Sequence, residues 1–272
     1  MDVSVILVSY NTKDLTRTCL NSIYKYTKGI EFEVFVVDNN SQDGSADMIE
    51  QEFPKVHLIK NPDNKGFGAA NNIAIKQSNA KYVFCLNTDT LLLDNSVKKF
   101  YDFMEQNQNV GACGGQLLNA DGNLAISCGK FPNLADLIFR TFKLNNILPN
   151  LYNNRISTFT LRSFNNISPV DYITGADLFI RKSILDKVGI FDEEFFMYYE
   201  DTDLCKRIKN SGNKLVIIPD IKIVHHESKS TSDNIKKIKM SKKSEILYFK
   251  KHSGKILYNL VKMYNTIKYG EL

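Results

Sequence analysis

The first 110 residues alternate short β-branched runs with segments of helical periodicity, and this alternation strongly limits the folds open to the chain. Strands are predicted at residues 3–8, 33–38, 56–59 and 81–86. Helices are predicted where Leu15, Cys19 and Ile23 recur every four residues, and at 45–53, 68–78 and 96–106. Strands that alternate with helices predict an α/β fold with a mostly parallel, Rossmann-like central sheet flanked by helices on both faces.

The second half of the chain is less regular. Residues 130–168 are rich in Asn and contain Pro132 and Pro149, so loops and short helices are expected there. Further elements are predicted as strands near 171–180, 215–218 and 221–224, a helix near 201–211, and an amphipathic helical tail from residue 235. We therefore expect one large α/β unit with a C-terminal helical appendage.

Charge is unevenly distributed along the 272 residues. The net charge is +5, but residues 228–272 carry 11 Lys and 3 acidic residues, so residues 1–227 have a net charge of −3. A basic surface for nucleic acid is therefore not indicated, and no nucleic-acid partner is expected. The tail permits two interpretations: a solvated helix whose apolar stripe packs on the body, or an interfacial helix attracted to anionic lipid.

The sequence does not indicate secretion or a membrane span. No apolar run reaches the roughly 18 to 20 residues that cross a bilayer, and the N-terminus lacks the basic start and cleavage site of a signal peptide. Five scattered cysteines, an odd number without paired metal spacing, favour reduced thiols. A cytoplasmic protein is therefore expected.

Polar side chains follow three of the predicted strands, at the point where each strand ends. These clusters are Ser9-Tyr10-Asn11, the run from residue 38 to residue 45, and Asn87-Thr88-Asp89. Ligands of open parallel sheets bind beyond the carboxyl ends of the strands, so all three clusters are candidate binding residues. The run from 38 to 45 is alternatively a turn followed by a helix cap, since its Asn, Asp, Gly and Ser residues favour turns.

A glycine-containing loop, Lys65-Gly66-Phe67-Gly68, precedes the helix predicted at 68–78. A dinucleotide-binding fingerprint would lie on the first strand–helix turn and have a third glycine, whereas Asn71 occupies that position here. A Rossmann dehydrogenase is therefore disfavoured. Backbone amides at the helix start, with Lys65 beside them, are candidates to contact a phosphate, and a plain loop is the alternative.

Two groups of acidic residues are candidates for chemistry. Asp89 follows a buried strand, where one or two carboxylates often hold a Mg²⁺ bound to substrate phosphates; a turn residue is the alternative. Glu200 and Asp201 follow a run of aromatic residues, so one of them is a candidate general base with a raised pKa. The alternative is that both favour a helix N-terminus through its dipole. His225 ends a late strand and is either structural or part of a site with Asp89.

Taken in order, these motifs resemble the inverting nucleotide-sugar glycosyltransferases of family 2, which have the GT-A fold, and especially the bacterial rhamnosyltransferase-like branch. The matching stretches include residues 5–11 (VILVSYN), 36–45 (VVDNNSQDGS), 61–72, 86–89 (LNTD), 174–176 (TGA), 189–193, 199–204 (YEDTDL) and 224–226 (VHH). The resemblance implies a catalytic domain at 1–227, with a nucleotide-binding half (1–110) and an acceptor-binding half (111–227). A basic amphipathic helical tail (228–272) follows.

The resemblance also implies roles for individual residues. The nucleotide-sugar-binding residues would be Ser9, Tyr10, Asn11, Asp38, Asn40, Lys65, Gly66, Asn87, Thr88 and Asp89. Asp38 would hydrogen-bond the pyrimidine ring, and Asn87 replaces the first acid of the family's Asp-x-Asp metal motif. Asp89 would hold Mg²⁺ or Mn²⁺, with His225 as a candidate second ligand.

Asp201, next to Glu200, would be the catalytic base, and Gly175 and Ala176 would lie near the sugar and the acceptor. The implied activity is a metal-dependent, inverting transfer from dTDP-rhamnose or a UDP-hexose to a glycan or lipid-linked glycan in surface-polysaccharide assembly. Such an enzyme is expected in the cytoplasm, at the inner face of the membrane if the tail binds anionic lipid. Two alternatives are a nucleotide-sugar-binding protein without transferase activity and a sugar nucleotidyltransferase.

Overall fold

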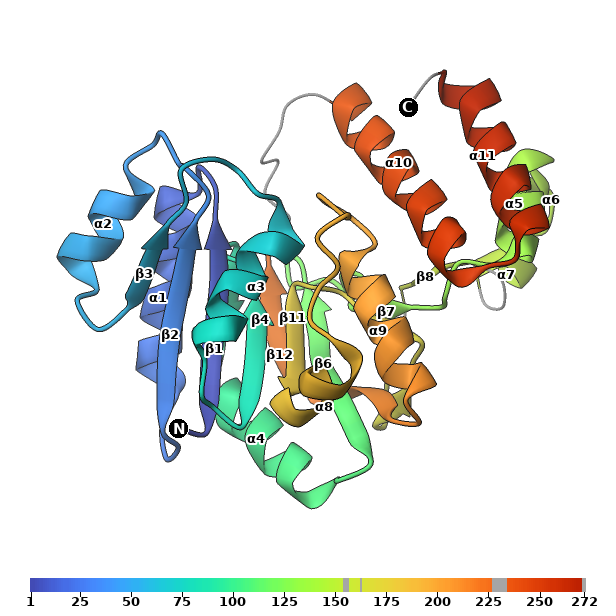
Figure 1. Ribbon diagram of the computed structural model, residues 1–272. Helices are drawn as coiled ribbons and strands as arrows, with labels where there is room; N and C mark the ends of the chain where they lie inside the picture. The colour runs from blue at the N-terminus through green and yellow to red at the C-terminus, as the bar shows by residue number, and fades with distance from the viewer. Residues whose placement is uncertain (154–156, 162, 227–233, 271–272) are drawn as a thin grey trace.

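A mixed β-sheet runs through the centre of the computed structural model, which describes residues 1–153, 157–161, 163–226 and 234–270 (Figure 1). Its strands within these residues are β1 (Val3–Ser9), β2 (Phe32–Asp38), β3 (His57–Lys60), β4 (Tyr82–Leu86), β5 (Thr90–Leu92), β6 (Val110–Leu118), β9 (Ser168–Pro169), β11 (Asp177–Arg181) and β12 (Lys214–His225). The strand order is β3-β2-β1-β4-β11-β6-β12-β5, with β9 beside β12. Strands β3, β2, β1 and β4 are parallel, as are β6 and β12, whereas β11, β5 and β9 pair in antiparallel fashion.

Helices cover both faces of the sheet because successive strand residues point to opposite sides. In β1, Val5 and Leu7 join one apolar core, while Ile6 joins the other. The first core is covered by α1 (Lys13–Tyr26), α2 (Ser45–Glu52) and α4 (Ser96–Gln106). The second is covered by α3 (Phe67–Gln77), α8 (Lys182–Val188) and α9 (Glu200–Asn210). The predicted α/β fold with helices on both faces of a largely parallel sheet is confirmed.

The elements predicted in the first half are observed with ends shifted by at most one or two residues. In the second half, the two strands predicted at 215–218 and 221–224 form one strand, β12, with a register shift at Pro219 and Asp220. The segment near 171–180 forms two strands, β10 (Tyr172–Ile173) and β11, separated by a loop. Strands β5 and β6 and helix α8 were not predicted.

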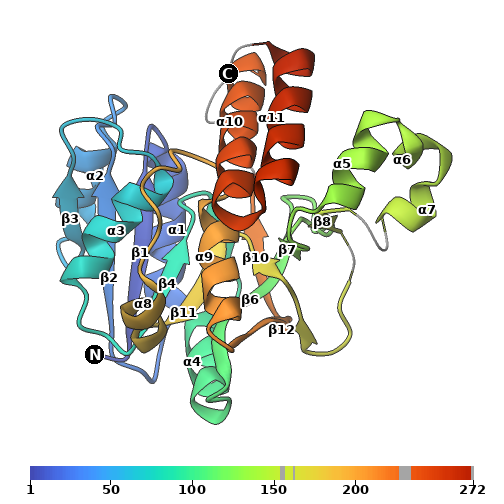
Figure 2. The same ribbon diagram turned by 45° about the vertical axis from the view of Figure 1, so that its right-hand side comes forward.

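The Asn-rich segment contains short elements, as expected. Its helices are α5 (Leu134–Thr141), α6 (Leu144–Ile147) and α7 (Pro149–Leu151). A second, small sheet joins β10 to β7 (Cys128–Gly129) and β8 (Phe159–Thr160). Figure 2 shows these helices projecting beside the C-terminal helices, away from the main sheet.

The C-terminal tail forms two helices, α10 (Asn234–His252) and α11 (Lys255–Tyr269), that pack on the body. Tyr248, Phe249 and Val261 are buried in a third apolar cluster with Leu137 of α5 and Phe195. The tail therefore packs an apolar stripe on the body, which was one of the two interpretations of its sequence. The predicted boundary between residues 227 and 228 lies outside the described residues.

Two further expectations bear on the whole chain. None of the helices built from the described residues combines the length and apolarity needed to traverse a bilayer. All five cysteines are buried free thiols.

Candidate active site

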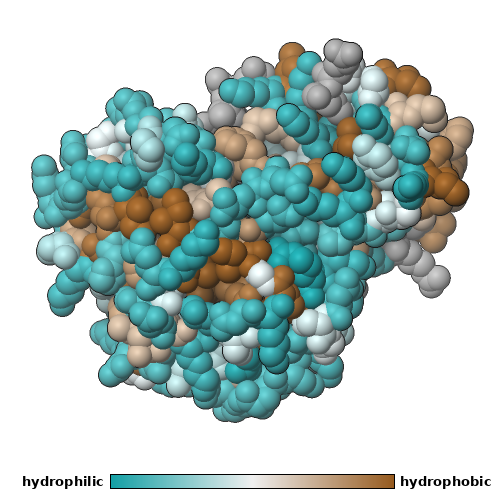
Figure 3. All heavy atoms as spheres, in the orientation of Figure 1, coloured by the Kyte–Doolittle hydropathy of each residue, from teal (hydrophilic) through white to brown (hydrophobic). Residues whose placement is uncertain are grey.

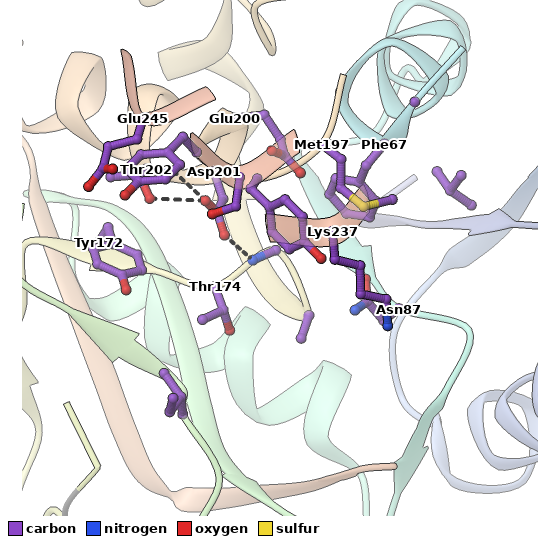
Figure 4. Close-up of a pocket in the computed structure, with 18 of the residues that line it drawn as sticks. Phe67, Asn87, Tyr172, Thr174, Met197, Glu200, Asp201, Thr202, Lys237 and Glu245 are labelled. Carbon is purple, nitrogen blue, oxygen red and sulfur yellow. Dashed lines mark hydrogen bonds between the residues drawn. The ribbon is translucent and has the colours of Figure 1, made fainter. Parts of the chain in front are cut away.

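A cavity of about 710 Å³ lies where the carboxyl ends of β1 and β4 meet the start of β11 and the end of β12. That volume is within the range of sites for drug-sized ligands. Ten of the residues singled out in the sequence line it, namely Tyr10, Gly66, Asn87, Thr88, Asp89, Gly175, Ala176, Glu200, Asp201 and His225. These residues are far apart in the chain, and the sheet brings them together because all lie at one of its edges. Figure 4 shows the interior of this cavity.

Asp89 and His225 meet at one end of the cavity because β5, which follows Asp89, pairs with the end of β12. Asp89 Oδ1 lies 3.2 Å from His225 Nε2, and Asn87 Nδ2 lies 3.3 Å from the same ring nitrogen. The chain is held in place by a hydrogen bond from the His226 N–H to the Asp89 carbonyl, at 2.9 Å. A carboxylate and an imidazole are therefore adjacent at this end of the cavity.

This pair of side chains fits a divalent cation that is also bound by a substrate. Carboxylate oxygens suit Mg²⁺ and Mn²⁺, and imidazole suits several transition metals. Within the described parts of the chain, no three His, Cys, Asp or Glu side chains are grouped to hold a metal. The remaining coordination positions of a cation bound here would be filled by phosphate oxygens and water.

Five of the predicted nucleotide-binding residues do not line the cavity and instead hold its loops. The Ser9 hydroxyl faces Thr12 and Thr16 of the following helix, and Lys65 pairs with Asp63 at 2.8 Å. Asn11 Oδ1 accepts a hydrogen bond from the Gln42 N–H at 2.7 Å, and Asn40 accepts one from the Gln42 side chain at 3.1 Å. The contact between Asn11 and Gln42 ties the loop after β1 to the loop after β2, and the others are local to their own segments.

Asp38 is the fifth of these residues, and one of its oxygens lacks a partner. It is buried at the end of β2, where Oδ1 accepts a hydrogen bond from the Ser41 N–H at 2.9 Å. Among the described residues Oδ2 has no hydrogen-bond partner, although it is buried. A buried, unsatisfied carboxylate oxygen is costly, so this atom is a candidate to accept a hydrogen bond from a ligand.

The neighbouring Asn39, which belongs to the predicted polar run 38–45 but was given no individual role, lines the cavity and joins two loops. Its side chain donates to the Gly66 carbonyl at 3.2 Å and accepts from Asn61 at 2.8 Å. Gly66 has a φ of 84°, and a Cβ there would lie 2.2 Å from the Phe196 carbonyl oxygen. Glycine is therefore required for the loop before α3 to pack against the loop before α9.

Asp201 lies in the middle of the cavity, on the first turn of α9. Its Oδ2 accepts a hydrogen bond from the Gly175 N–H at 2.9 Å, and its Oδ1 accepts one from the Thr202 N–H at 2.6 Å (Figure 4). The Thr202 hydroxyl also donates to Oδ1, at 3.1 Å. A Cβ at Gly175 would lie 2.9 Å from the Phe67 ring, so a larger residue would displace the backbone donor.

Glu200 and Asp201 form a pair of acids whose environments differ. Burial raises the pKa of Glu200, and the charge of Asp201 raises it further. Burial also raises the pKa of Asp201, but hydrogen bonds from Gly175 and Thr202 partly offset the increase. Glu200 Oε2 is buried without a hydrogen-bond partner among the described residues. The pair therefore favours a neutral Glu200 beside an ionised Asp201.

The end of the cavity opposite Asp89 and His225 is formed by residues that were not predicted from the sequence. Arg140 of α5 lies between Asp136 and Glu245, at 2.8 Å and 2.7 Å, and Lys242 pairs with Glu245 at 2.9 Å. Glu245 and Lys242 belong to α10, so the tail forms part of the cavity wall. Helical periodicity in the tail predicted its helix, but no signal in the sequence indicated which side of that helix would face the site.

The comparisons with known proteins identify a family. The family model "Glycosyl transferase family 2" matches residues 4–187. A Mycobacterium tuberculosis protein, N-acetylglucosaminyl-diphospho-decaprenol L-rhamnosyltransferase, is 28% identical over 238 residues, which cover 81% of this chain and 76% of that one. The dTDP-rhamnosyl transferase RfbF of Shigella flexneri is 28% identical over 227 residues, or 82% of this chain and 69% of that protein. The predicted resemblance to rhamnosyltransferases of this family is confirmed.

Solved structures support the same fold. The mannosyltransferase PcManGT from Pyrobaculum calidifontis, in complex with GDP-Man and Mn²⁺, superposes with a TM-score of 0.63 at 20% identity, over 93% of this chain and 65% of that one. S. aureus TarS 1–349 in complex with UDP gives a TM-score of 0.59 at 20% identity, over 91% of this chain and 66% of that one. This chain spans just under two thirds of each solved chain. The predicted GT-A fold is confirmed.

Proposed function

The chain belongs to glycosyltransferase family 2, and on that premise we propose that it transfers a sugar from a nucleotide-diphosphate donor to an acceptor hydroxyl with inversion at the anomeric carbon. The observation that carries this proposal is the arrangement of the cavity. A carboxylate held by backbone donors, Asp201, lies between a candidate metal end, with Asp89 and His225, and a second end formed by Arg140 and Glu245. A direct displacement needs one base and one site for the leaving group, and the cavity has a candidate for each.

In the proposed reaction, Asp201 accepts the proton of the acceptor hydroxyl as its oxygen attacks the anomeric carbon. The new carbon–oxygen bond forms as the bond from that carbon to the donor phosphate oxygen breaks, and the nucleoside diphosphate leaves with the electron pair. The Gly175 N–H and the Thr202 N–H and hydroxyl hold the Asp201 carboxylate in position. The Gly175 donor belongs to the loop that joins β10 and β11.

We propose that the donor diphosphate lies beside Asn87, Asp89 and His225. Asp89 and His225 would hold a Mn²⁺ or Mg²⁺, which supplies positive charge to the leaving diphosphate when it is bound. The Mn²⁺ in the PcManGT complex and the acid–imidazole pair in this chain support that assignment. The rhamnosyltransferase relatives support dTDP-rhamnose as the donor, with a UDP-hexose as the alternative.

We propose a glycan on a lipid carrier as the acceptor, in surface-polysaccharide assembly at the cytoplasmic face of the membrane. The decaprenol named for the M. tuberculosis relative supports a lipid-linked acceptor. Exposed apolar residues of α11, flanked by lysines, support peripheral association with an anionic membrane. The acceptor would enter the cavity from the side of α5 and α10.

Ligand-dependent thermal stability tests the donor site. UDP, GDP, dTDP and their sugars would each be added with and without Mn²⁺ to the wild type, to Asp89→Ala, and to Asp121→Ala, an exposed turn variant that serves as control. Because binding to the native state stabilises it, we expect a Mn²⁺-dependent rise in Tm of a few degrees with a pyrimidine diphosphate. Asp89→Ala should lose this rise and Asp121→Ala should keep it. A wild type that responds to no nucleotide would contradict the proposed donor.

A further inference from the structure

Helix α10 forms one wall of the cavity along much of its length. Its four lining residues are Lys237, Ser241, Lys242 and Glu245, and their spacing places them on one side of the helix. This side lines the cavity that also contains Asp201 and Asn87. The tail thus contributes charged side chains to the same cavity that holds the candidate base.

The charged side chains of α10 that line the cavity differ in whether they form ion pairs. Lys242 and Glu245 pair with each other, and Glu245 also binds Arg140, so these groups are neutralised within the wall. Lys237 is half-buried and, within the described residues, forms no ion pair. The Lys237 side chain extends from α10 toward Asn87 in Figure 4. The cavity therefore contains an ammonium group whose charge no described carboxylate compensates.

The position of Lys237 matches the leaving-group end of the cavity. It lies eight residues before Glu245, or about 12 Å along the helix axis, because an α-helix rises about 1.5 Å per residue. Glu245 is at the Arg140 end, so Lys237 is near the end that contains Asn87, Asp89 and His225. Among the described residues, Asp89 is the one carboxylate grouped with Asn87 and His225 at this end, since an amide occupies position 87.

We propose that Lys237 binds the β-phosphate of the nucleotide-sugar donor and offsets the charge that develops on the diphosphate as it leaves. This inference rests on the proposed transfer reaction. A preorganised ammonium in a partly desolvated cavity stabilises such charge far better than one in water. A cation from the tail would add its charge to that of a metal held by Asp89 and His225.

Calorimetric titration of the full chain with nucleotides that differ by one phosphate tests this assignment. UDP and UMP, and dTDP and dTMP, would be titrated in Mn²⁺ into the wild type, Lys237→Ala, Lys237→Arg and Lys239→Ala. Lys239 is an exposed lysine of the same helix that does not line the cavity. We expect Lys237→Ala to weaken binding of the preferred diphosphate about tenfold, while monophosphate binding changes by less than about twofold. Lys237→Arg should retain most of the affinity, and Lys239→Ala should match the wild type.

The results that would contradict the phosphate contact differ from the result that would contradict the proposed function. If Lys237→Ala lost affinity equally for the diphosphate and the monophosphate, or lost affinity for neither, the β-phosphate contact would be overturned. The transferase proposal would remain intact. Unchanged diphosphate affinity combined with reduced turnover of a phosphate-bearing acceptor would assign Lys237 to the acceptor, and so would also overturn it. A wild type that binds no nucleoside diphosphate would refute the proposed function itself. The melting temperature of each variant shows whether the helix remains folded.

Discussion

Two adjacent carboxylates at the start of α9 have different partners, and this difference supports different proposed roles for them. Asp201 accepts hydrogen bonds from two backbone amides and a hydroxyl, which stabilise its charged form. Glu200 has a buried oxygen without a partner among the described residues, and both burial and the Asp201 charge raise its pKa. These contacts favour ionisation of Asp201 before Glu200 and support the proposal that Asp201 is the base.

We expect Asp201→Asn to lower kcat by about 10²- to 10⁴-fold, because general-base catalysis contributes about that much. Glu200→Gln should cost much less, since a neutral amide resembles the protonated acid in shape and charge. In the wild type, kcat/KM should fall as pH decreases through the raised pKa of Asp201. This acidic limb should stay in place in Glu200→Gln, because Glu200 is already neutral where Asp201 titrates. A pH–rate profile of the three proteins measures both effects.

An acidic limb that disappears in Glu200→Gln, or a larger loss of kcat there than in Asp201→Asn, would make Glu200 the base. Melting temperatures provide the control, since both substitutions remove a buried acid whose pKa is raised by burial. Each variant should be at least as stable as the wild type at high pH. The reason is that a buried acid with a raised pKa disfavours the folded state once the pH is high enough to ionise it.

At the scale of single residues, the sequence predicted the parts of the site that lie at strand ends. Asp89 could be proposed because an α/β sheet places its ligands at one edge, whereas Asp201 was proposed from its acidic cluster after an aromatic run and from the family resemblance. The contact between Asp89 and His225 could not be computed, since it depends on β5 pairing with the end of β12, and β5 was not predicted. Asn39 was included in the polar run 38–45 but was given no individual role, and Lys237 was missed because a Lys in a basic helix is common without any ligand.

At the scale of elements, an ion-pair network joins α5 to the tail. Arg140 bridges Asp136 of its own helix and Glu245 of α10, and Asn265 of α11 donates to Glu245 at 3.2 Å. Burial alone would raise the pKa of Glu245, but Lys242 and Arg140 more than offset that effect, so its pKa lies below the usual range. Glu245 therefore stabilises the fold above its ordinary pKa and loses that contribution as the pH falls through the depressed one.

Replacing Arg140 by Met should destabilise the protein by about 3 kcal/mol near neutral pH, because it leaves two buried carboxylates without their shared cation. Thermal or urea unfolding measures the loss. Arg17→Met is the matched control, since Arg17 pairs with Glu52 and Asp14 on the surface, and its melting temperature should barely change. The deficit of Arg140→Met should shrink near pH 4, where protonation removes the unpaired charges. Equal effects at both sites would show that the network is not effectively buried.

The elements that the sequence did not predict have identifiable causes. Strand β6 has the sequence VGACGGQLL, and glycines disfavour a strand by their own propensity. They are needed because a Cβ at Gly115 would lie 2.6 Å from the Ile221 carbonyl oxygen of β12. That close approach is a tertiary contact between residues about a hundred positions apart. The sequence pattern within β6 alone therefore cannot predict it.

At the scale of the whole molecule, helices α5 and α10, which line the cavity, belong to one exposed end. Figures 1 and 2 place α5, α6, α7, α10 and α11 together at this end, and Figure 3 shows hydrophobic side chains on its right-hand side. The exposed apolar residues of α11 are Ile256, Leu260, Met263 and Ile267, and their spacing of four, three and four forms a continuous stripe. Three lysines of the same helix, Lys255, Lys262 and Lys268, supply positive charge.

This stripe makes the proposed membrane association testable without removing the tail. Deleting residues 228–272 would uncover Leu137 and Phe195 and leave Arg140 without Glu245, so reduced vesicle binding by that deletion would not identify the membrane contact. Point variants on the solvent side of α11 avoid this problem. Ile256 and Ile267 are suitable because their side chains are 81% and 79% exposed and support no internal packing.

We expect Ile256→Asp and Ile267→Asp each to reduce co-sedimentation with vesicles containing anionic phosphatidylglycerol by about tenfold. A fully buried Ile side chain contributes about 1.5–3 kcal/mol, and the new carboxylate is repelled by the anionic surface. Leu93→Asp is the control, since Leu93 is also an exposed apolar residue, at 42%, and lies away from the tail. High salt should weaken wild-type binding, because the lysines of α11 contribute electrostatically. Binding that is unchanged in both α11 variants, or reduced equally in Leu93→Asp, would remove the stripe as the membrane contact and leave the acceptor to reach the cavity from solution.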